Sequence, residues 1–195
     1  MPTDDRIRLE HYLLQSNDLT KYGILLALYS GMRIGEICAL KWSNINLKSG
    51  TVSVCQTLQR LQDRENKGKT KIYISEPKTQ SSKRIIPIPD FLTELLKTIQ
   101  PQNNHTFLLT GTKSPIEPKT LENAFKRCLK KCNIPRINFH ILRHTFATRC
   151  VELGFDMKSL SEILGHASMG TTLSIYAHPT LECKRNNMKK LVFLK

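Results

Sequence analysis

Hydrophobic residues recur every three or four positions along most of this chain, and that spacing predicts a largely helical protein. The first helix follows Thr3 or Asp4, either of which is a good N-cap residue. Gly31 interrupts the pattern between the second and third helices. The predicted helices cover residues 7–14, 19–30, 34–40, 90–99, 121–131, 140–153 and 157–164.

The hydrophobic pattern changes to a period of two after residue 51, which is typical of β-strands. The charged segment 63–69 predicts a hairpin tip, and the polar segment 79–83 predicts a second turn. We therefore expect a mainly α protein with a small three-stranded antiparallel β-sheet, of the α+β class. The predicted strands cover residues 51–54, 71–75 and 84–88.

The charge of the chain points to a polyanionic partner. It has 30 Lys and Arg against 16 Asp and Glu, which gives a formal net charge of +14. Such an excess is typical of proteins that bind nucleic acid. The alternative is a basic protein whose charge serves only its solubility.

Cysteine usage and hydropathy predict a cytoplasmic protein of one generous domain. The six cysteines include no C-x-x-C pair, which favours reduced thiols over a disulfide framework. No signal-peptide pattern begins the chain, and its longest apolar run, residues 23–29, is too short to cross a bilayer. No Pro/Gly/Ser-rich linker divides the 195 residues.

The most informative stretch for chemistry is His140-Ile141-Leu142-Arg143-His144. On a helix, His140, Arg143 and His144 share one face, because they lie three or four positions apart. Two imidazoles and a guanidinium on one face favour a site for a phosphodiester. Core or capping histidines, and metal ligands at the i, i+4 spacing, are the two other interpretations that stay open. A zinc-protease site is excluded, because Ile141 stands where that motif needs Glu.

Four further short motifs bear on this stretch, and each of them alone has a plain structural explanation. Arg33 and Glu36 in S-G-M-R-I-G-E form a pair of a kind common on protein surfaces. Lys78 in E-P-K-T lies in a polar turn. His166 in L-G-H follows the end of a predicted helix, and Tyr176 in I-Y-A-H has a polar context.

Together these motifs resemble the tyrosine recombinases, which are the phage, transposon and Xer-type integrases. The chain reads Arg…Lys…His-x-x-Arg…Gly-His…Tyr, with the local words P-K-T, H-x-L-R-H-T-F-A-T, L-G-H and T-T-x-x-I-Y-A-H. The resemblance runs from about residue 19 to residue 178. It implies the catalytic-domain fold of that family over residues 1–180, with helices and a three-stranded sheet.

The resemblance also implies which residues act on DNA. Arg33 and Arg143 would hold the scissile phosphate, and Glu36 would support the first of them. Two arginine forks can hold the non-bridging oxygens, and they bind more tightly as negative charge builds there. The implied catalytic residues are Arg33, Lys78, His140, Arg143, His166 and Tyr176.

The remaining roles concern the nucleophile and the protons. Tyr176 would attack the phosphate, although a phenol with a pKa near ~10 is scarcely ionised at neutral pH. A cationic pocket favours the phenolate, and an imidazole from His140 or His166 would accept its proton. Lys78, the lysine of a mobile hairpin, would protonate the departing 5′-oxygen. This chemistry calls for no metal and no cofactor.

Other residues of the same motifs are expected to be structural. We interpret His144 as a residue whose imidazole is hydrogen-bonded inside the protein. Arg84 and Thr79 fit the hairpin motif of the family, where they would serve hairpin structure or contact the DNA backbone. Cys128 and Cys132 lie one helical turn apart and are interpreted as packing residues.

The family resemblance further implies partners. The substrate would be double-stranded DNA at attachment sites, bound by a homotetramer that is a monomer when free, with accessory directionality proteins. The amino-terminal DNA-binding domains of the family do not fit before residue 19, so we expect an isolated catalytic domain of bacterial or phage origin. The tail, residues 181–195, combines basic residues with the apolar cluster Leu191–Leu194 and is expected to dock on a neighbouring protomer.

Three alternative functions remain. A type IB topoisomerase uses a similar set of groups and would relax supercoiled DNA without recombinant products. A non-catalytic DNA-binding module would bind DNA without cleaving it. A metal-dependent hydrolase would lose activity to chelators, whereas the phosphotyrosyl route would not.

Overall fold

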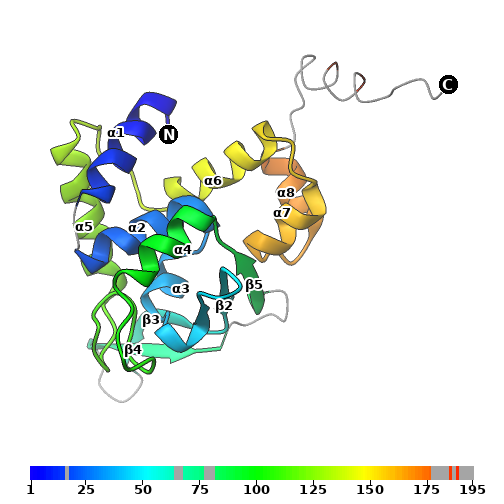
Figure 1. Cartoon of the computed structure of the whole chain (residues 1–195). Helices are drawn as coiled ribbons and strands as arrows, with labels where there is room; N and C mark the ends of the chain where they lie inside the picture. Colours follow the sequence, from blue (N-terminus) through cyan, green and yellow to red (C-terminus); the bar gives the residue numbers. More distant parts are fainter. Residues whose placement is uncertain (16–17, 64–67, 77–81, 177–184, 186–187, 189–195) are drawn as a thin grey trace.

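The computed structural model describes residues 1–15, 18–63, 68–76, 82–176, 185 and 188 of the 195-residue chain. Its helices form a bundle that rests on a small layer of strands (Figure 1), which confirms the expected mainly α fold with a small antiparallel sheet. The helices are α1 (Thr3–Leu14), α2 (Leu19–Ser30), α3 (Ile34–Cys38), α4 (Asp90–Lys97), α5 (Pro118–Lys131), α6 (Ile141–Glu152), α7 (Met157–Leu164) and α8 (Met169–Tyr176). The strands are β1 (Ile45–Asn46), β2 (Thr51–Val54), β3 (Thr57–Gln62), β4 (Thr70–Ser75) and β5 (Arg84–Pro87).

Helix α2 lies at the centre of the fold because its middle is apolar on every face. Residues 22–28 are all buried, and α1, α3, α5 and α6 pack around them. Asp18 caps the start of α2 by accepting a hydrogen bond from the amide of Thr20 (2.9 Å). Gly31 ends the helix in the left-handed conformation, with φ of 65°. The chain therefore leaves α2 abruptly and places Arg33 at the entrance of α3.

A second, smaller hydrophobic core joins α6 to α7, apart from the main core around α2. Gly31 belongs to this junction as well, because a Cβ on it would lie 2.6 Å from Phe146 and 2.8 Å from Leu164. The end of α2 approaches α6 and α7 this closely only because residue 31 has no side chain. The buried residues of this smaller core are Ala147, Cys150, Leu160 and Leu164.

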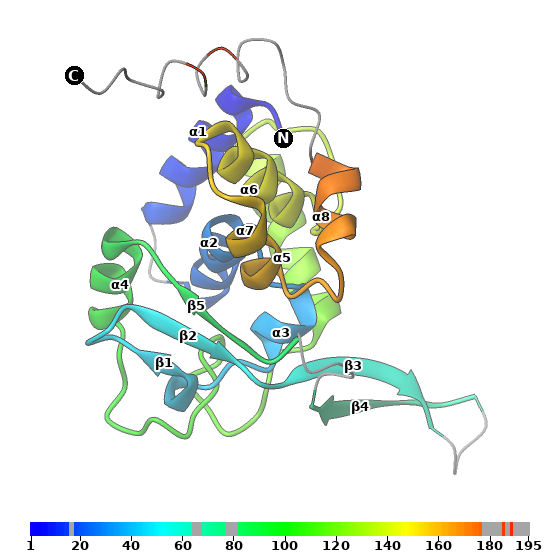
Figure 2. The same ribbon diagram turned by 90° about the vertical axis from the view of Figure 1, so that its right-hand side faces the viewer.

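The strands form two separate antiparallel sheets instead of the single sheet expected. β1, β2 and β5 make a three-stranded sheet, but β4 pairs with β3 in a two-stranded ribbon that projects from the body (Figure 2). The prediction that residues 71–75 share a sheet with 51–54 and 84–88 is therefore wrong. Leu58 is the one buried residue along β3, so this strand does not alternate between buried and exposed side chains. The expected hairpin tip is confirmed at its ends, where the amide of Asp63 donates to the carbonyl of Lys69 (2.8 Å).

Most of the predicted helices agree with the structure, and α2 and α7 agree to the residue. The predicted cap of the first helix is wrong, because Pro2 occupies the N-cap position of α1. Helix α8 has no counterpart in the hydrophobic pattern, since Gly170 and its neighbouring threonines are poor helix formers. It forms where the chain packs on α7 and α6.

No helix in the described ranges is long and apolar enough to span a membrane.

The described cysteines are free thiols, and all of them except the half-buried Cys55 lie in the interior. Burial raises the pKa of Cys38 to about 12, and that of Cys128 and Cys150 to about 11. Such thiols stay protonated at neutral pH, which agrees with the interpretation of Cys128 as a packing residue.

Some of the predictions lie outside the described residues. Lys78 and Thr79 do so, and so does the tail at 181–195 apart from residues 185 and 188. That the tail docks on another protomer stays a prediction.

The Gly31 junction gives a first prediction. Gly31→Ala should lower the free energy of unfolding by roughly 2–5 kcal/mol, because it combines a left-handed alanine with overpacking against Phe146 and Leu164. Gly154→Ala is the matched control, since Gly154 also has positive φ (80°) but nothing within 4 Å of an added Cβ, and should cost only about 1–2 kcal/mol. Urea denaturation measures both. Equal losses would mean that packing at Gly31 does not constrain the junction.

Candidate active site

His140 lies immediately before α6 rather than inside it. Its backbone is nevertheless helical (φ −63°, ψ −20°), so the amide of His144 still donates to the His140 carbonyl (3.2 Å). The two imidazoles consequently keep the i, i+4 relation expected from the sequence and meet edge to face, with ring centroids 4.6 Å apart. His140 is exposed, whereas His144 is half-buried, in line with the structural role expected for His144.

Arg143 turns into the protein, although the sequence placed it on one face with the two histidines. Arg143 is only 3% exposed, and its guanidinium donates to the carbonyls of Gly31 (2.7 Å) and Leu164 (2.8 Å). One carbonyl belongs to the residue that ends α2, and the other to the last residue of α7. Arg143 is thereby fixed between two helix ends by backbone atoms that no side-chain rotation can move.

Glu36 supports Arg33, as the sequence suggested, but it also binds a second arginine. Its carboxylate accepts hydrogen bonds from the amide of Arg33 (2.8 Å) and from the Arg33 guanidinium (3.0 Å). It also holds Arg84 in a bidentate pair, at 3.0 and 2.9 Å. The side chains of Glu36 and Arg84 are 3% and 6% exposed, so this ion pair is buried. Burial alone would raise the pKa of Glu36, but the hydrogen bonds and charges of Arg84 and then Arg33 outweigh it and lower the pKa.

The buried guanidinium of Arg84 has only protein partners among these contacts, as the structural one of the two roles expected for it would require. It also donates to the carbonyl of Ser82 (3.1 Å), so it ties the chain just before β5 to α3. The hydrophobic pattern gave no sign of this inward orientation.

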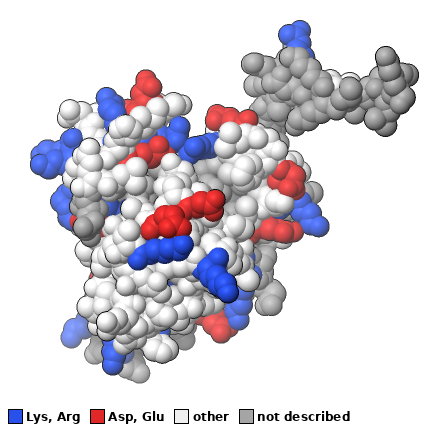
Figure 3. Space-filling view, viewed as in Figure 1, with Lys and Arg blue, Asp and Glu red and all other residues white. Residues whose placement is uncertain are grey.

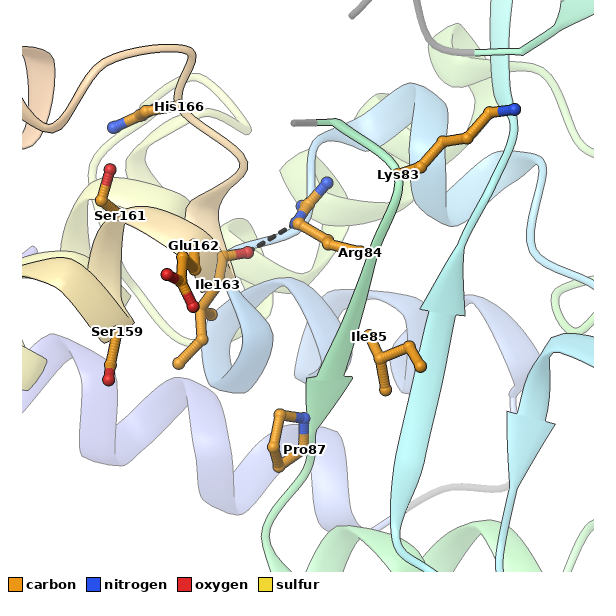
Figure 4. Close-up of a pocket in the computed structure, with 9 residues that line it drawn as sticks. All are labelled: Lys83, Arg84, Ile85, Pro87, Ser159, Ser161, Glu162, Ile163 and His166. Carbon is orange, nitrogen blue, oxygen red and sulfur yellow. Dashed lines mark hydrogen bonds between the residues drawn. The ribbon is translucent and has the colours of Figure 1, made fainter. Parts of the chain in front are cut away.

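The three arginines share one anchor, the last turn of α7. Arg84 donates to the carbonyl of Ile163 (2.6 Å), as Figure 4 shows, Arg143 to that of Leu164, and Arg33 to that of Gly165 (3.5 Å). The last carbonyls of a helix have no partner within the helix and lie at its negative end, so guanidinium groups suit them. Gly165 ends α7 with φ of 65°, and the Arg84 side chain would lie only 3.0 Å from a Cβ there. This explains the Gly in the L-G-H motif.

His166 directly follows this anchor and is neutral at physiological pH. Burial lowers its pKa to about 4, and the positive charges of Arg143 and Arg33 act in the same direction. Burial, then His144, Arg143 and Arg33, lower the pKa of His140. The Nδ1 atom of His166 lies 2.7 Å from the hydroxyl of Thr172, a fully buried residue on α8 that the sequence analysis did not single out.

A cavity of about 510 Å³ lies between β5 and α7, beside the arginines. Arg84 and His166 line it, with Glu162 and two serines on the α7 side (Figure 4). Lys83 points away from α7 there and pairs with Glu76 (2.6 Å). Because Arg33, Arg143 and His140 do not line it, this cavity adjoins the candidate site without being its centre.

The structure thus brings Arg33, Arg143, His140 and His166 within electrostatic range of one another. Tyr176 is the last residue of α8, which packs against α6 and α7, and its side chain lies outside the described part of the structure. Lys78 lies outside it as well. The roles of both residues remain predictions.

Comparison with known proteins gives consistent matches. The model of the phage integrase family matches residues 8–182. A tyrosine recombinase XerC-like protein of Caldanaerobacter subterraneus subsp. tengcongensis is 30% identical over 207 residues, covering 97% of this chain and 53% of that protein. The chain thus spans about half the length of the curated relatives it matches.

Solved structures with the same fold include two integrases. The Tn1549 transposon integrase in complex with circular intermediate DNA has a TM-score of 0.75 at 27% identity, covering 98% of this chain and 66% of that one. The catalytic domain of bacteriophage HP1 integrase shares the fold, with a TM-score of 0.63 at 21% identity over 97% of this chain and 92% of that domain.

The buried Glu36–Arg84 pair gives a second prediction. Glu36→Gln should lower the free energy of unfolding by about 3–5 kcal/mol at pH 7, because it leaves the buried Arg84 without its counter-charge. Folding lowers the pKa of Glu36 from its ordinary value of 4.5. The ionised carboxylate therefore stabilises the fold at pH values above 4.5, and this stabilisation is lost as the pH falls through the folded-state pKa. The difference between wild type and variant should therefore shrink on acidification below about pH 4.5.

Denaturant titrations at several pH values measure this difference. Glu94→Gln is the control, since the exposed pair of Glu94 with Lys97 should contribute at most about 0.5 kcal/mol. A difference that stays constant across the acid range would contradict the assigned ion pair.

Proposed function

The chain belongs to the phage integrase family, and we propose that it is the catalytic part of a site-specific DNA recombinase. In this proposal residues 1–180 form the catalytic domain. It cuts and rejoins DNA strands through a 3′-phosphotyrosyl intermediate on Tyr176, which integrates or excises a mobile element.

The observation that carries the proposal is the convergence of two arginines and two histidines at the end of α7. Arg33 and Arg143 come from different ends of the chain, yet both are anchored to adjacent carbonyls of that helix end. The same two charges act on His140 and His166. A fixed group of donors with excess positive charge is suited to one phosphodiester.

The reaction follows from these groups. The phenol oxygen of Tyr176 attacks phosphorus, the bond from phosphorus to the 5′-oxygen breaks, and the phosphate remains a diester on the tyrosine. Negative charge grows on the two non-bridging oxygens, where Arg33 and Arg143 donate. Removal of one such donor typically costs roughly 10²–10³ in rate.

Two protons must move. Tyrosine, with a pKa near ~10, keeps its proton until a base accepts it. His140 is the base we assign, because it is exposed and its lowered pKa keeps it neutral. We assign to Lys78 the delivery of a proton to the departing 5′-oxygen. Because the new ester conserves the energy of the broken bond, the reverse reaction rejoins the strands without a cofactor.

The substrate in this proposal is double-stranded attachment-site DNA. The net charge of +14 supports it, and the Tn1549 relative is itself in complex with DNA. On the face drawn in Figure 3, acidic and basic side chains are mixed. That mixed face is therefore not the surface we assign to DNA.

We further propose that the enzyme acts as a tetramer in which each tail docks on a neighbouring copy. The receiving surface is an apolar groove of about 520 Å³ between α4, α6 and α7. Phe91, Leu153 and Phe155 expose their side chains along it. The apolar cluster Leu191–Leu194 of a second copy is the occupant that suits this groove.

A nicked suicide substrate tests the chemistry. With candidate attachment-site DNA, the protein should form a covalent adduct visible on a denaturing gel, because the short 5′-hydroxyl product diffuses away and prevents rejoining. Tyr176→Phe should abolish the adduct, and EDTA should leave it unchanged. Tyr12→Phe is the control, since Tyr12 lies on α1 away from the site.

Each other outcome has a defined meaning. DNA binding without any adduct would indicate a non-catalytic module. An adduct that survives Tyr176→Phe would overturn the assignment of the nucleophile. Relaxation of supercoiled DNA without recombinant products would favour a topoisomerase, and loss of activity with EDTA would favour metal-dependent hydrolysis.

Mass measurements of protein–DNA complexes test the assembly. Deletion of residues 189–195, or Leu153→Asp in the groove, should leave complexes with one duplex intact and remove complexes that hold two duplexes. Leu153 is 66% exposed, so its substitution leaves the fold unchanged. Complexes with two duplexes that persist in both variants would contradict tail docking in this groove.

A further inference from the structure

Thr172 is a buried polar residue to which the proposed reaction gives no task. It lies on α8 with 0% of its surface exposed, and its hydroxyl is 2.7 Å from Nδ1 of His166. The two residues belong to different segments, since His166 follows the end of α7. This hydrogen bond therefore connects the loop that carries His166 to the helix that ends in Tyr176.

The bond restricts what His166 can do. A neutral imidazole has one N–H, on either Nδ1 or Nε2, and the partner of one nitrogen decides the state of the other. With Nδ1 engaged by Thr172, only Nε2 remains to meet DNA. A hydroxyl that donates to Nδ1 keeps the proton on Nε2, where it can donate to a phosphate oxygen beside Arg33 and Arg143.

We propose that Thr172 is a positioning residue, whose hydroxyl donates to Nδ1 of His166 and holds an Nε2–H toward the scissile phosphate. Tyr176 lies four residues after Thr172 on α8, which is one helical turn. The hydrogen bond forms only when α8 is in place, so His166 is oriented when the helix of the nucleophile is docked. The task at the phosphate rests on the proposed function, whereas the hydrogen bond and the tautomer do not.

A purely structural role makes a different prediction. If the hydroxyl only satisfied a buried polar group, its loss would lower stability, and any effect of that loss on the cleavage rate would be the same with and without His166. Since removal of the hydroxyl would lower stability in either case, stability alone does not distinguish the two roles.

The first experiment uses the free protein. Nitrogen-15 NMR of the imidazole side chains should show His166 as the Nε2–H tautomer in wild type and in Thr172→Ser, which keeps the hydroxyl. Thr172→Val, which has the same shape without a hydroxyl, should shift the population toward Nδ1–H. Thr93→Val is the matched control, because Thr93 is a buried helical threonine in α4, and it should leave the His166 signals unchanged.

The second experiment is a double-mutant cycle on the suicide substrate. Thr172→Val should slow adduct formation roughly 10–100-fold, less than the outright loss of a donor to the phosphate. Thr172→Ser should restore most of the rate. In a His166→Ala background, Thr172→Val should cause no further loss, because its effect passes through that imidazole.

Two results would overturn the inference. One is a His166 tautomer that is the same in wild type and Thr172→Val. The other is an equal loss of rate from Thr172→Val with and without His166. If wild type formed no adduct, the proposed function and the task at the phosphate would both fail, and the NMR experiment would still decide the hydrogen bond.

Discussion

The arrangement of the site depends on one physical fact, that the last carbonyls of a helix lack partners within the helix. At the end of α7, the carbonyls of residues 163, 164 and 165 each accept from a different guanidinium. These arginines come from β5, α6 and the entrance of α3, which are distant in sequence. A single helix end thus fixes their relative positions. The left-handed conformation of Gly165 stops the helix there and leaves His166 beside them.

Gathering three guanidinium groups raises their mutual repulsion, and the fold offsets only part of it. Glu36 is the buried carboxylate among them, and it binds Arg84 in a bidentate pair. Arg33 shares the same carboxylate, while the guanidinium of Arg143 donates to the backbone carbonyls of Gly31 and Leu164. The site therefore keeps an excess of positive charge. Burial, together with that positive charge, lowers the pKa of His140 and His166 and keeps both imidazoles neutral. A bound phosphate diester would offset the excess of positive charge.

The sequence predicted those elements in which the spacing of hydrophobic residues matches the spacing of the buried side chains. Helix α2 is apolar throughout and α7 is amphipathic, so both were predicted to the residue. β3 and α8 were not, because β3 buries only Leu58 and α8 contains Gly170; they depend on backbone pairing and on packing. The motifs singled out Arg33, Glu36, Arg143, His140 and His166, which the structure brings together. They could not show that Arg84 turns inward or that Thr172 meets His166, since neither contact leaves a periodic signal.

The small core between α6 and α7 has a thermodynamic consequence. Helices α7 and α8 share little of the main core, and α7 is held by four buried residues and by hydrogen bonds at its end. Such a unit opens at a lower free energy than the helices around α2, so it detaches without global unfolding. The segment that ends in Tyr176 then belongs to a unit that opens at a lower free energy than the main core. The chain can therefore release this unit while the rest of the fold remains intact.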